Sequence, residues 1–176
     1  MSKILIIGGG AMGSAFSIPC LENNNLVTIT EPYNKIFIKN LNSKKKFHPS
    51  LKLYLPKKLK FVNYSKEIFK KRFDLIVIAL SLAGIDFIGK ELKDLNIKTP
   101  LLVLTKGLNF DKKKKRILTI SNLLKNNYRA ANVSVLKGPC LAKELANKNK
   151  TSVVVANKNI KIAKWIGKLI STKYYL

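Results

Sequence analysis

Three glycines near the start of the chain have the spacing that nucleotide phosphates require. Gly8, Gly10 and Gly13 form the pattern G-x-G-x-x-G, which follows an apolar run and opens a helical pattern at Met12. The first glycine permits a tight turn, the second lets backbone approach a pyrophosphate, and the third lets helix pack closely on strand. Free amides at the helix start would face the phosphates. The pattern predicts a dinucleotide site, and the alternative is a glycine-rich turn without a ligand.

Glu31 ends the second apolar run, at the separation from the glycines that a ribose-binding carboxylate has. Its carboxylate can accept hydrogen bonds from an adenosine ribose and would repel a 2′-phosphate. Glu31 therefore favours NAD over NADP. Pro19 fits the pattern less well, because it falls inside the first expected helix and should kink or end it.

Lys106 follows another apolar run, within Thr105-Lys106-Gly107-Leu108. Ligands of open α/β sheets bind beyond the carboxyl ends of the strands. A lysine there can meet an anionic substrate or polarise a carbonyl oxygen. Position alone leaves open whether Lys106 is simply one more surface lysine.

A third motif, Lys137-Gly138-Pro139-Cys140-Leu141-Ala142-Lys143-Glu144, leads from a strand into a helix. Gly138 would bring the backbone close to a ligand, and Pro139 suits a first helical turn. Amides from Cys140 to Ala142 would then face the same cleft as the glycine loop. Cys140 is not expected to act as a nucleophile, because His48 is the only histidine available to activate it.

Alternating strands and helices must position these motifs. Strands are expected at 4–7, 26–30, 60–62, 75–79, 101–104, 133–136 and 152–156, and helices at 12–22, 35–41, 65–71, 85–95, 113–125, 141–147 and 160–170. Continuous apolar strands are typical of parallel sheets buried on both faces. We therefore expect an α/β, Rossmann-type doubly wound, mostly parallel sheet with helices on both faces.

Two basic stretches fit the alternation of strands and helices least. The polar residues 40–60 are expected to form a surface excursion. The charge run Asp111 to Arg116 is expected to be the solvated first turn of a helix, capped by Asp111. The dinucleotide-binding domain is expected to cover residues 1–156.

Composition excludes several classes of protein. The 176 residues are 47% hydrophobic, which excludes disorder of most of the chain. The two cysteines, Cys20 and Cys140, cannot form a disulfide framework and lack metal-ligand spacing. With a single histidine, we expect no metal. The longest apolar stretch is too short to span a membrane.

The formal net charge is +25, from 34 Lys and Arg against 9 Asp and Glu. Nucleic acid is the obvious partner for such a charge. However, only Arg72, Arg116 and Arg129 are arginines, and base readers favour arginine. Lysine, asparagine and isoleucine are all encoded by A- and T-only codons. A coding bias therefore explains the charge better than nucleic-acid binding does.

The apolar N-terminus superficially resembles a secretory or lipoprotein signal ending at Cys20. The glycines from Gly8 to Gly13 would break the apolar helix of a signal, and Pro19 stands where a small residue should precede the cysteine. We therefore expect a folded N-terminus and a cytoplasmic protein.

Taken together, the motifs resemble a known family. The glycine loop, Thr105-Lys106-Gly107-Leu108 and Gly138-Pro139-Cys140-Leu141-Ala142-Lys143-Glu144, in this order and spacing, look like the NAD(P)-dependent sn-glycerol-3-phosphate dehydrogenases. The segment 55–59 and the strand after Asp74 are also similar. The resemblance covers roughly residues 3 to 160. It implies interconversion of dihydroxyacetone phosphate and glycerol 3-phosphate with NAD, or with NADP.

The resemblance also implies roles for individual residues. Ala11 and Met12 would line the pyrophosphate, and Lys106 would touch both cofactor and substrate. Gly138 and Cys140 would lie on the substrate side, and Ala142 on the cofactor. The family usually has serine or threonine at the Cys140 position and serine at that of Lys137; the strand after Asp74 usually ends in a proline, where this chain has Ser81.

Length is the larger departure from the family. Members have a second, helical domain that supplies the catalytic lysine, and residues 157–176 would only begin the crossover into it. We therefore expect no assured catalytic residue in this chain and little turnover by it alone. A separately encoded helical domain or a homodimer would be a fitting partner. Two other functions stay open: a non-catalytic dinucleotide-binding module or subunit, and a basic nucleic-acid-binding protein.

Overall fold

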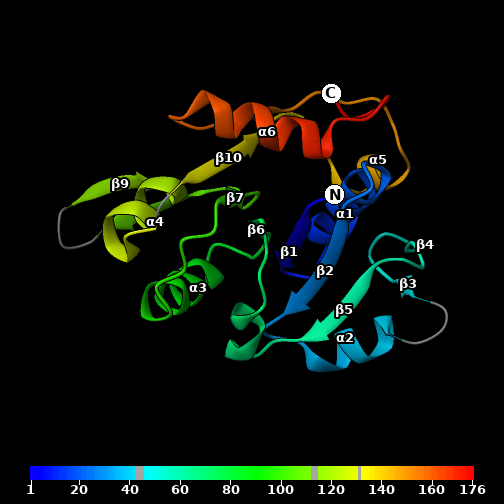
Figure 1. The fold of residues 1–176 in the computed structure, drawn as a ribbon, viewed down its shortest axis with the longest axis horizontal. Coiled ribbons are helices and arrows are strands. Elements are labelled where there is room, and N and C mark those ends of the chain that lie inside the picture. The colour runs from blue at the N-terminus through cyan, green and yellow to red at the C-terminus, as the bar shows by residue number, and fades with distance from the viewer. Residues whose placement is uncertain (43–45, 112–114, 131) are drawn as a thin grey trace.

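One seven-stranded sheet forms the centre of the molecule (Figure 1). The computed structural model describes residues 1–42, 46–111, 115–130 and 132–176. The strand order is β11-β10-β7-β6-β1-β2-β5, and only β11 runs antiparallel to its neighbour. The strands are β1 (Lys3–Ile7), β2 (Leu26–Glu31), β5 (Lys60–Asn63), β6 (Leu75–Ile78), β7 (Leu101–Val103), β10 (Val133–Lys137) and β11 (Val154–Ala156). The expected Rossmann-type α/β fold is therefore confirmed.

Helices connect these strands, and two small ribbons lie outside the sheet. The helices of the described residues are α1 (Ala11–Glu22), α2 (Lys35–Leu41), the 3-10 helix η1 (Lys66–Lys70), α3 (Gly84–Asp94), α4 (Ile120–Tyr128), α5 (Ala142–Ala146) and α6 (Ile160–Ile170). The antiparallel ribbons pair β3 (Phe47–His48) with β4 (Leu53–Tyr54), and β8 (Leu108–Asp111) with β9 (Arg116–Thr119).

The central strand is buried on both faces. Alternate side chains of a strand point to opposite sides of the sheet. Ile4 and Ile6 join a core cluster with residues of α1, α2, α5 and α6, whereas Leu5 and Ile7 join a second cluster with residues of α3 and α4. All four side chains are 0% exposed. Continuous apolar strands thus mark a sheet covered by helices on both faces.

The sheet changes its direction of growth between β1 and β6. From β1 the chain continues to β2 and β5 on one side, then returns to β6, β7 and β10 on the other. The loops after β1 and β6 leave the same edge together, and the Ala79 amide donates to the Ile7 carbonyl at 2.8 Å. In open α/β sheets this switch point is where ligands bind.

The helix expected over residues 113–125 is shorter than predicted. Arg116 to Thr119 form β9, which pairs with β8, and α4 begins at Ile120. The Thr119 hydroxyl accepts from the Asn122 amide at 3.2 Å, so the N-cap is Thr119. The expected cap, Asp111, instead lies in β8, and residues 112–114 of the charge run lie outside the described residues.

The stretch over residues 40–60 is not only a surface excursion. It forms the ribbon of β3 and β4, and it buries His48, Leu51, Leu55 and Leu59 at 5% exposure or less. Pro19 does not end the first helix, because α1 continues to Glu22. Pro19 lies in the last helical turns and is buried, and the Asn23 amide donates to its carbonyl at 3.2 Å.

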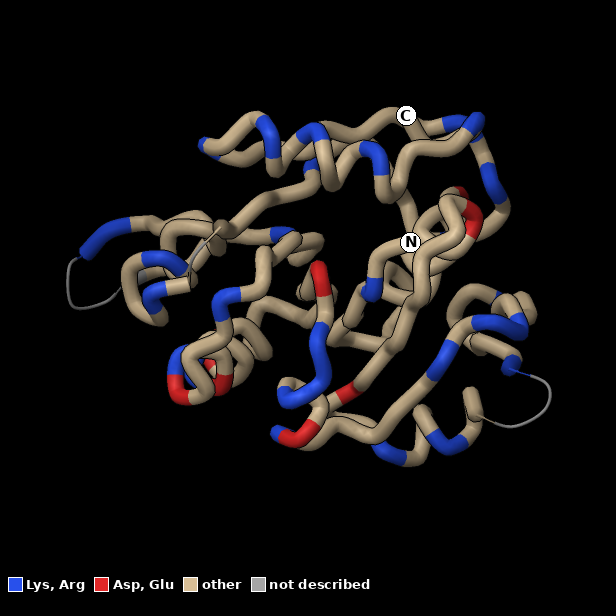
Figure 2. The backbone as a smooth tube through the Cα atoms, viewed as in Figure 1, with Lys and Arg blue, Asp and Glu red and all other residues tan. Residues whose placement is uncertain are grey.

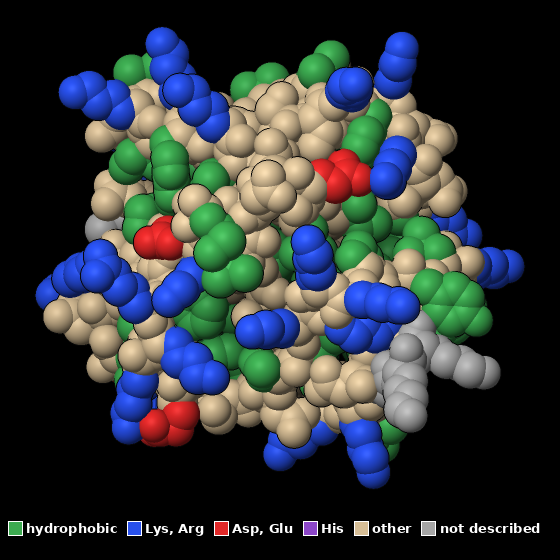
Figure 3. Space-filling view, turned by 45° about the vertical axis from the view of Figure 1, so that its right-hand side comes forward, with side chains coloured by type: hydrophobic (Ala, Val, Ile, Leu, Met, Phe, Trp, Pro, Cys, Tyr) green, Lys and Arg blue, Asp and Glu red, His purple; other side chains and the backbone are tan. Residues whose placement is uncertain are grey.

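Basic residues lie on every part of the fold. Figure 2 places Lys and Arg on the sheet, the helices and the connecting loops, with few acidic residues among them. On the face in Figure 3, their side chains are interrupted by apolar and uncharged surface. This dispersal favours the coding-bias interpretation of the charge. Across the described ranges, no helix combines the length and apolar character needed to cross a membrane.

Candidate functional site

The glycine loop joins β1 to α1, and its shape requires that two of its residues, Gly8 and Gly13, have no Cβ atom. Gly8 has φ +115°, and a Cβ there would collide with the Ala79 carbonyl. A Cβ on Gly13 would collide with the Gly8 carbonyl, so α1 lies directly against the loop. These are the tight turn and the close packing that the G-x-G-x-x-G pattern predicts.

Gly10 is the N-cap of α1 and faces open space. A Cβ added to Gly10 would meet no atom within 4 Å. Within the described ranges, no side chain caps α1 and its first turn carries no acidic residue. The start of this helix therefore presents amides and the positive end of its dipole to the space beside Gly10. That combination fits an anionic group such as a pyrophosphate.

Glu31 lies at the end of β2, against the glycine loop. Its Oε2 accepts from the Gly9 amide at 2.9 Å, and its Oε1 accepts from the Tyr33 amide at 3.0 Å. A carboxylate has about four acceptor positions, so each oxygen keeps capacity for a further donor. The half-buried carboxylate is thus held in place and can still accept from a ligand hydroxyl.

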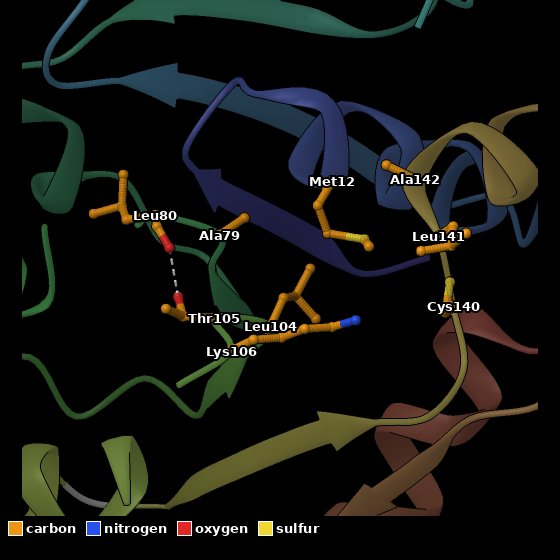
Figure 4. Close-up of a pocket in the computed structure, with 9 residues that line it drawn as sticks. All are labelled: Met12, Ala79, Leu80, Leu104, Thr105, Lys106, Cys140, Leu141 and Ala142. Carbon is orange, nitrogen blue, oxygen red and sulfur yellow. Dashed lines mark hydrogen bonds between the residues drawn. The ribbon is translucent and has the colours of Figure 1, made fainter. Parts of the chain in front are cut away.

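A cavity of about 250 Å³ opens beside the start of α1, at the carboxyl end of the sheet (Figure 4). Its walls come from α1, from the residues after β6 and β7, and from the segment between β10 and α5. Four predicted site residues line it: Met12, Lys106, Cys140 and Ala142. Thr105 and Leu141, which belong to the two predicted motifs, also line it, and three residues that sequence reasoning missed complete the wall: Ala79, Leu80 and Leu104.

Lys106 supplies the positive charge of this cavity. Figure 4 shows its side chain extending across the space between Met12 and Cys140. Thr105 holds the lysine loop in place, because its hydroxyl donates to the Leu80 carbonyl at 2.8 Å. The Lys137 ammonium donates to the Thr105 carbonyl at 3.4 Å and links the end of β10 to the same point. Lys137 thus connects β10 to the lysine loop and is not part of the cavity wall.

Cys140 faces the cavity from the opposite wall. Its side chain is 4% exposed, and burial raises the pKa of its thiol, while the Tyr175 hydroxyl and the Lys106 charge partly offset that effect. A neutral, buried thiol is a poor nucleophile. The Tyr175 hydroxyl is itself buried, faces the thiol, and makes no hydrogen bond of good geometry with the described residues.

The backbone packs so closely around Gly138 that no side chain fits there. Gly138 has φ +150°, and a Cβ there would lie 2.7 Å from the Ser152 carbonyl and 3.0 Å from the Val153 Cα. The segment leading into β11 therefore crosses directly over it. Gly138 is not part of the cavity wall, and its expected substrate contact stays a prediction.

An aromatic cluster next to Glu31 was also missed. The Phe87 ring lies between those of Tyr33 and Tyr64, with centroid separations of 5.8 and 5.5 Å. Tyr33 is 60% exposed and follows Glu31 by two residues, which was the available sequence signal. Phe87 comes from α3, which no local pattern connects to Glu31. A partly exposed aromatic surface here can stack on a planar ring.

Among the described residues, no cluster of three or more His, Cys, Asp and Glu side chains could hold a metal ion.

Comparison with known proteins gives consistent matches. A family model described as NAD-dependent glycerol-3-phosphate dehydrogenase N-terminus matches residues 3–163. A glycerol-3-phosphate dehydrogenase, NAD(P)+, of Francisella tularensis subsp. tularensis (strain WY96-3418) is 29% identical over 98% of this chain and 51% of that protein. One of Francisella philomiragia subsp. philomiragia is 31% identical over the same shares.

Solved structures agree with this fold. The Plasmodium falciparum glycerol-3-phosphate dehydrogenase structure has a TM-score of 0.86 at 18% identity, over 99% of this chain and 51% of that chain. The chain thus spans about half the length of the curated relatives it matches.

Proposed function

Because the chain belongs to the family of the NAD-dependent glycerol-3-phosphate dehydrogenase N-terminus, we propose that it binds NAD(H) as the dinucleotide-binding half of such an enzyme. The observation that carries the proposal is the cavity, which unites Met12, Lys106, Cys140 and Ala142 from three separate segments. The free start of α1 and the open space at Gly10 fit the cofactor's pyrophosphate.

The cofactor would lie along the switch point of the sheet. The amides of Ala11 and Met12 would bind the pyrophosphate, as helix N-termini bind anions. Glu31 would accept from the adenosine ribose and disfavour a 2′-phosphate. The rings around Tyr33 would stack on the adenine. Ala142 and Lys106 would border the cofactor at the far end, inside the cavity.

The substrate would be dihydroxyacetone phosphate or sn-glycerol 3-phosphate. When bound, the nicotinamide supplies or accepts the hydride. The Lys106 ammonium would attract the anionic substrate and polarise its carbonyl oxygen, in a cavity whose other walls are mostly apolar. Cys140 would face the substrate with a neutral thiol, and Gly138 would lie on the same side.

The residues that line the cavity do not provide an evident proton donor for the carbonyl oxygen of the substrate. Reduction of a ketone needs a proton donor as well as a hydride. Cys140 carries a buried thiol of raised pKa, and no other residue of the cavity wall besides Lys106 is titratable. The complete site would therefore need a second, helical domain after residues 157–176, on the same polypeptide or a separate one.

The direct test is a fluorescence titration of the 176-residue chain with NADH, using Gly10→Asp as the variant that places a carboxylate at the pyrophosphate. Saturable binding that Gly10→Asp abolishes supports the proposal, and failure of the wild-type chain to bind overturns it. With dihydroxyacetone phosphate added, we expect negligible NADH oxidation by the chain alone. Oxidation at rates typical of an enzyme would show that the second domain is dispensable.

The two alternatives give different results in related experiments. A non-catalytic module would bind NADH but oxidise none after mixing with the C-terminal half of the Francisella tularensis relative. A nucleic-acid-binding protein would bind DNA with an affinity that falls steeply with salt and is unaffected by Gly10→Asp. The dispersal of Lys and Arg in Figure 2 argues against the second alternative.

A further inference from the structure

His48 is a buried residue that touches the glycine loop. It is 1% exposed and lies in the ribbon of β3 and β4, far from the loop in sequence. Its Nε2 lies 3.2 Å from the Gly9 carbonyl oxygen, and the Phe37 ring meets the imidazole edge-on at a centroid distance of 5.3 Å. None of the roles derived above uses this side chain.

The neighbours of the ring determine which nitrogen carries the proton. The Leu51 amide lies 3.3 Å from Nδ1 and can only donate, so Nδ1 is the acceptor. In the neutral imidazole Nε2 then carries the hydrogen and donates to the Gly9 carbonyl. Burial keeps the ring neutral by lowering its pKa. His48 is thus a donor aimed at one peptide group of the loop.

Three side chains from three elements hold Gly9. The Ser14 hydroxyl of α1 donates to the same carbonyl at 2.8 Å, and Glu31 of β2 accepts from the Gly9 amide at 2.9 Å. Glycine has the greatest backbone freedom of any residue, so these bonds restrict a position that its residue type leaves free to move.

The planarity of the peptide bond transmits this restraint to Gly10. In a trans peptide the carbonyl of one residue and the amide N–H of the next point in opposite directions. With the Gly9 oxygen held inward by His48 and Ser14, the Gly10 N–H must point outward. The N–H then points towards the open space beside Gly10, where an added Cβ would meet no atom within 4 Å.

We propose that His48 is a positioning residue of the dinucleotide site, which aims the Gly10 amide at the cofactor's pyrophosphate by holding the Gly9 carbonyl. The proposal rests on the proposed function for its ligand, but the restraint on the loop exists without the ligand. In this arrangement His48, on the ribbon of β3 and β4, supports the phosphate loop. A loop ordered before binding loses less entropy on binding.

Three variants separate positioning from folding. His48→Phe keeps a ring against Phe37 but removes the donor, and His48→Gln restores an N–H at about the reach of Nε2. Phe47→Ala is the matched control, because Phe47 is the neighbouring residue of β3 and packs on Tyr54, away from the loop. If His48→Phe fails to fold, His48→Asn replaces it. The asparagine side chain is too short for its amide nitrogen to reach the Gly9 carbonyl.

The first measurement is the ¹⁵N order parameter of the Gly10 amide in the ligand-free chain. We expect a rigid value, about 0.85, in the wild type and in Phe47→Ala and His48→Gln, and a fall below about 0.6 in His48→Phe. An unchanged order parameter in the donor-free variant overturns the proposal, whatever the chain binds.

The second measurement is the dissociation constant for NADH and for inorganic pyrophosphate. Loss of one buried hydrogen bond predicts a rise of about 3- to 10-fold in His48→Phe, with recovery in His48→Gln. An equal rise in Phe47→Ala would contradict a specific role of His48. If the Gly10 amide of the wild type is rigid but the chain binds neither NADH nor pyrophosphate, the proposed function and the positioning role are both overturned. Only the restraint of the loop by His48 would then remain.

Discussion

The carboxylate of Glu31 accepts a hydrogen bond from the amide of Gly9 at 2.9 Å, so the ribose-binding candidate and the phosphate loop are one connected unit. If the proposed site binds a dinucleotide, a negative charge fixed at this point would favour NADH over NADPH. A 2′-phosphate brought beside Glu31 would meet a carboxylate that the amides of Gly9 and Tyr33 hold in place.

Glu31→Gln should therefore reduce the preference for NADH over NADPH. We expect the wild type to favour NADH, and the variant to lose roughly 1 kcal/mol of that preference, the upper end for interactions between exposed charges. Paired fluorescence titrations measure it. Glu67→Gln, at an exposed ion pair with Lys70, is the control and should change neither affinity. Equal or tighter binding of NADPH by the wild type would refute this role of Glu31.

Substitutions at two glycines of the loop should have opposite consequences. Gly10 faces open space, so Gly10→Asp should leave the free energy of unfolding within about 1 kcal/mol of the wild type while abolishing NADH binding. A Cβ at Gly13 would collide with the Gly8 carbonyl, so Gly13→Ala should lower the free energy of unfolding by about 2 kcal/mol or more. Denaturant titrations of both variants measure the difference. Comparable destabilisation by the two would mean that Gly10 is also needed for packing.

The local parts of this site were readable from the sequence, and its long-range parts were not. The glycines, Glu31 and Lys106 follow strands whose apolar runs are conspicuous, and parallel strands bring their carboxyl ends to one edge. His48 and Phe87 depend on contacts between distant segments, which local periodicity does not encode. The β8–β9 ribbon was mistaken for a helix start because its pairing, between residues such as Phe110 and Ile117, spans a charge run typical of solvated helices.

His48 should make stability depend on pH below about 6.5. Burial lowers its pKa in the folded chain, so below the ordinary value of about 6.5 the unfolded chain binds the extra proton and the folded chain does not. Stability is then complete above pH 6.5 and declines as the pH falls towards the lowered pKa. The slope is at most about 1.4 kcal/mol per pH unit for one group.

Because the chain has a single histidine, one variant isolates this effect. Denaturant unfolding between pH 5 and 7.5 should show the decline in the wild type and a flatter profile in His48→Gln. The pKa of Glu22 is lowered by Lys148 and Tyr174 against the effect of its burial, so its contribution is lost in a more acidic range, below about pH 4.3. An identical slope in the variant would assign the decline to other groups.

Tyr175 and Cys140 connect the end of the described chain to the cavity. The Tyr175 side chain is 1% exposed, packs edge-on against Phe16, and has no partner of good geometry for its hydroxyl among the described residues. A buried hydroxyl without a partner costs roughly 1–3 kcal/mol. Tyr175→Phe should therefore be neutral or stabilising in unfolding experiments, although the removed atom lies deep in the core.

Cys140, the member of the Tyr175–Cys140 pair that lines the cavity, can be tested with Cys140→Ser. A serine hydroxyl is a stronger hydrogen-bond donor than a thiol, so we expect glycerol 3-phosphate to bind the NADH-loaded variant about 3- to 10-fold more tightly than the wild type. Calorimetric titration measures the change, and Cys20→Ser, at a cysteine buried away from the cavity wall, is the control. If Cys140→Ser weakened binding, the serine hydroxyl would be directed at Tyr175 instead of at the ligand. Combining Cys140→Ser with Tyr175→Phe should then restore the gain, because the competing hydroxyl is gone.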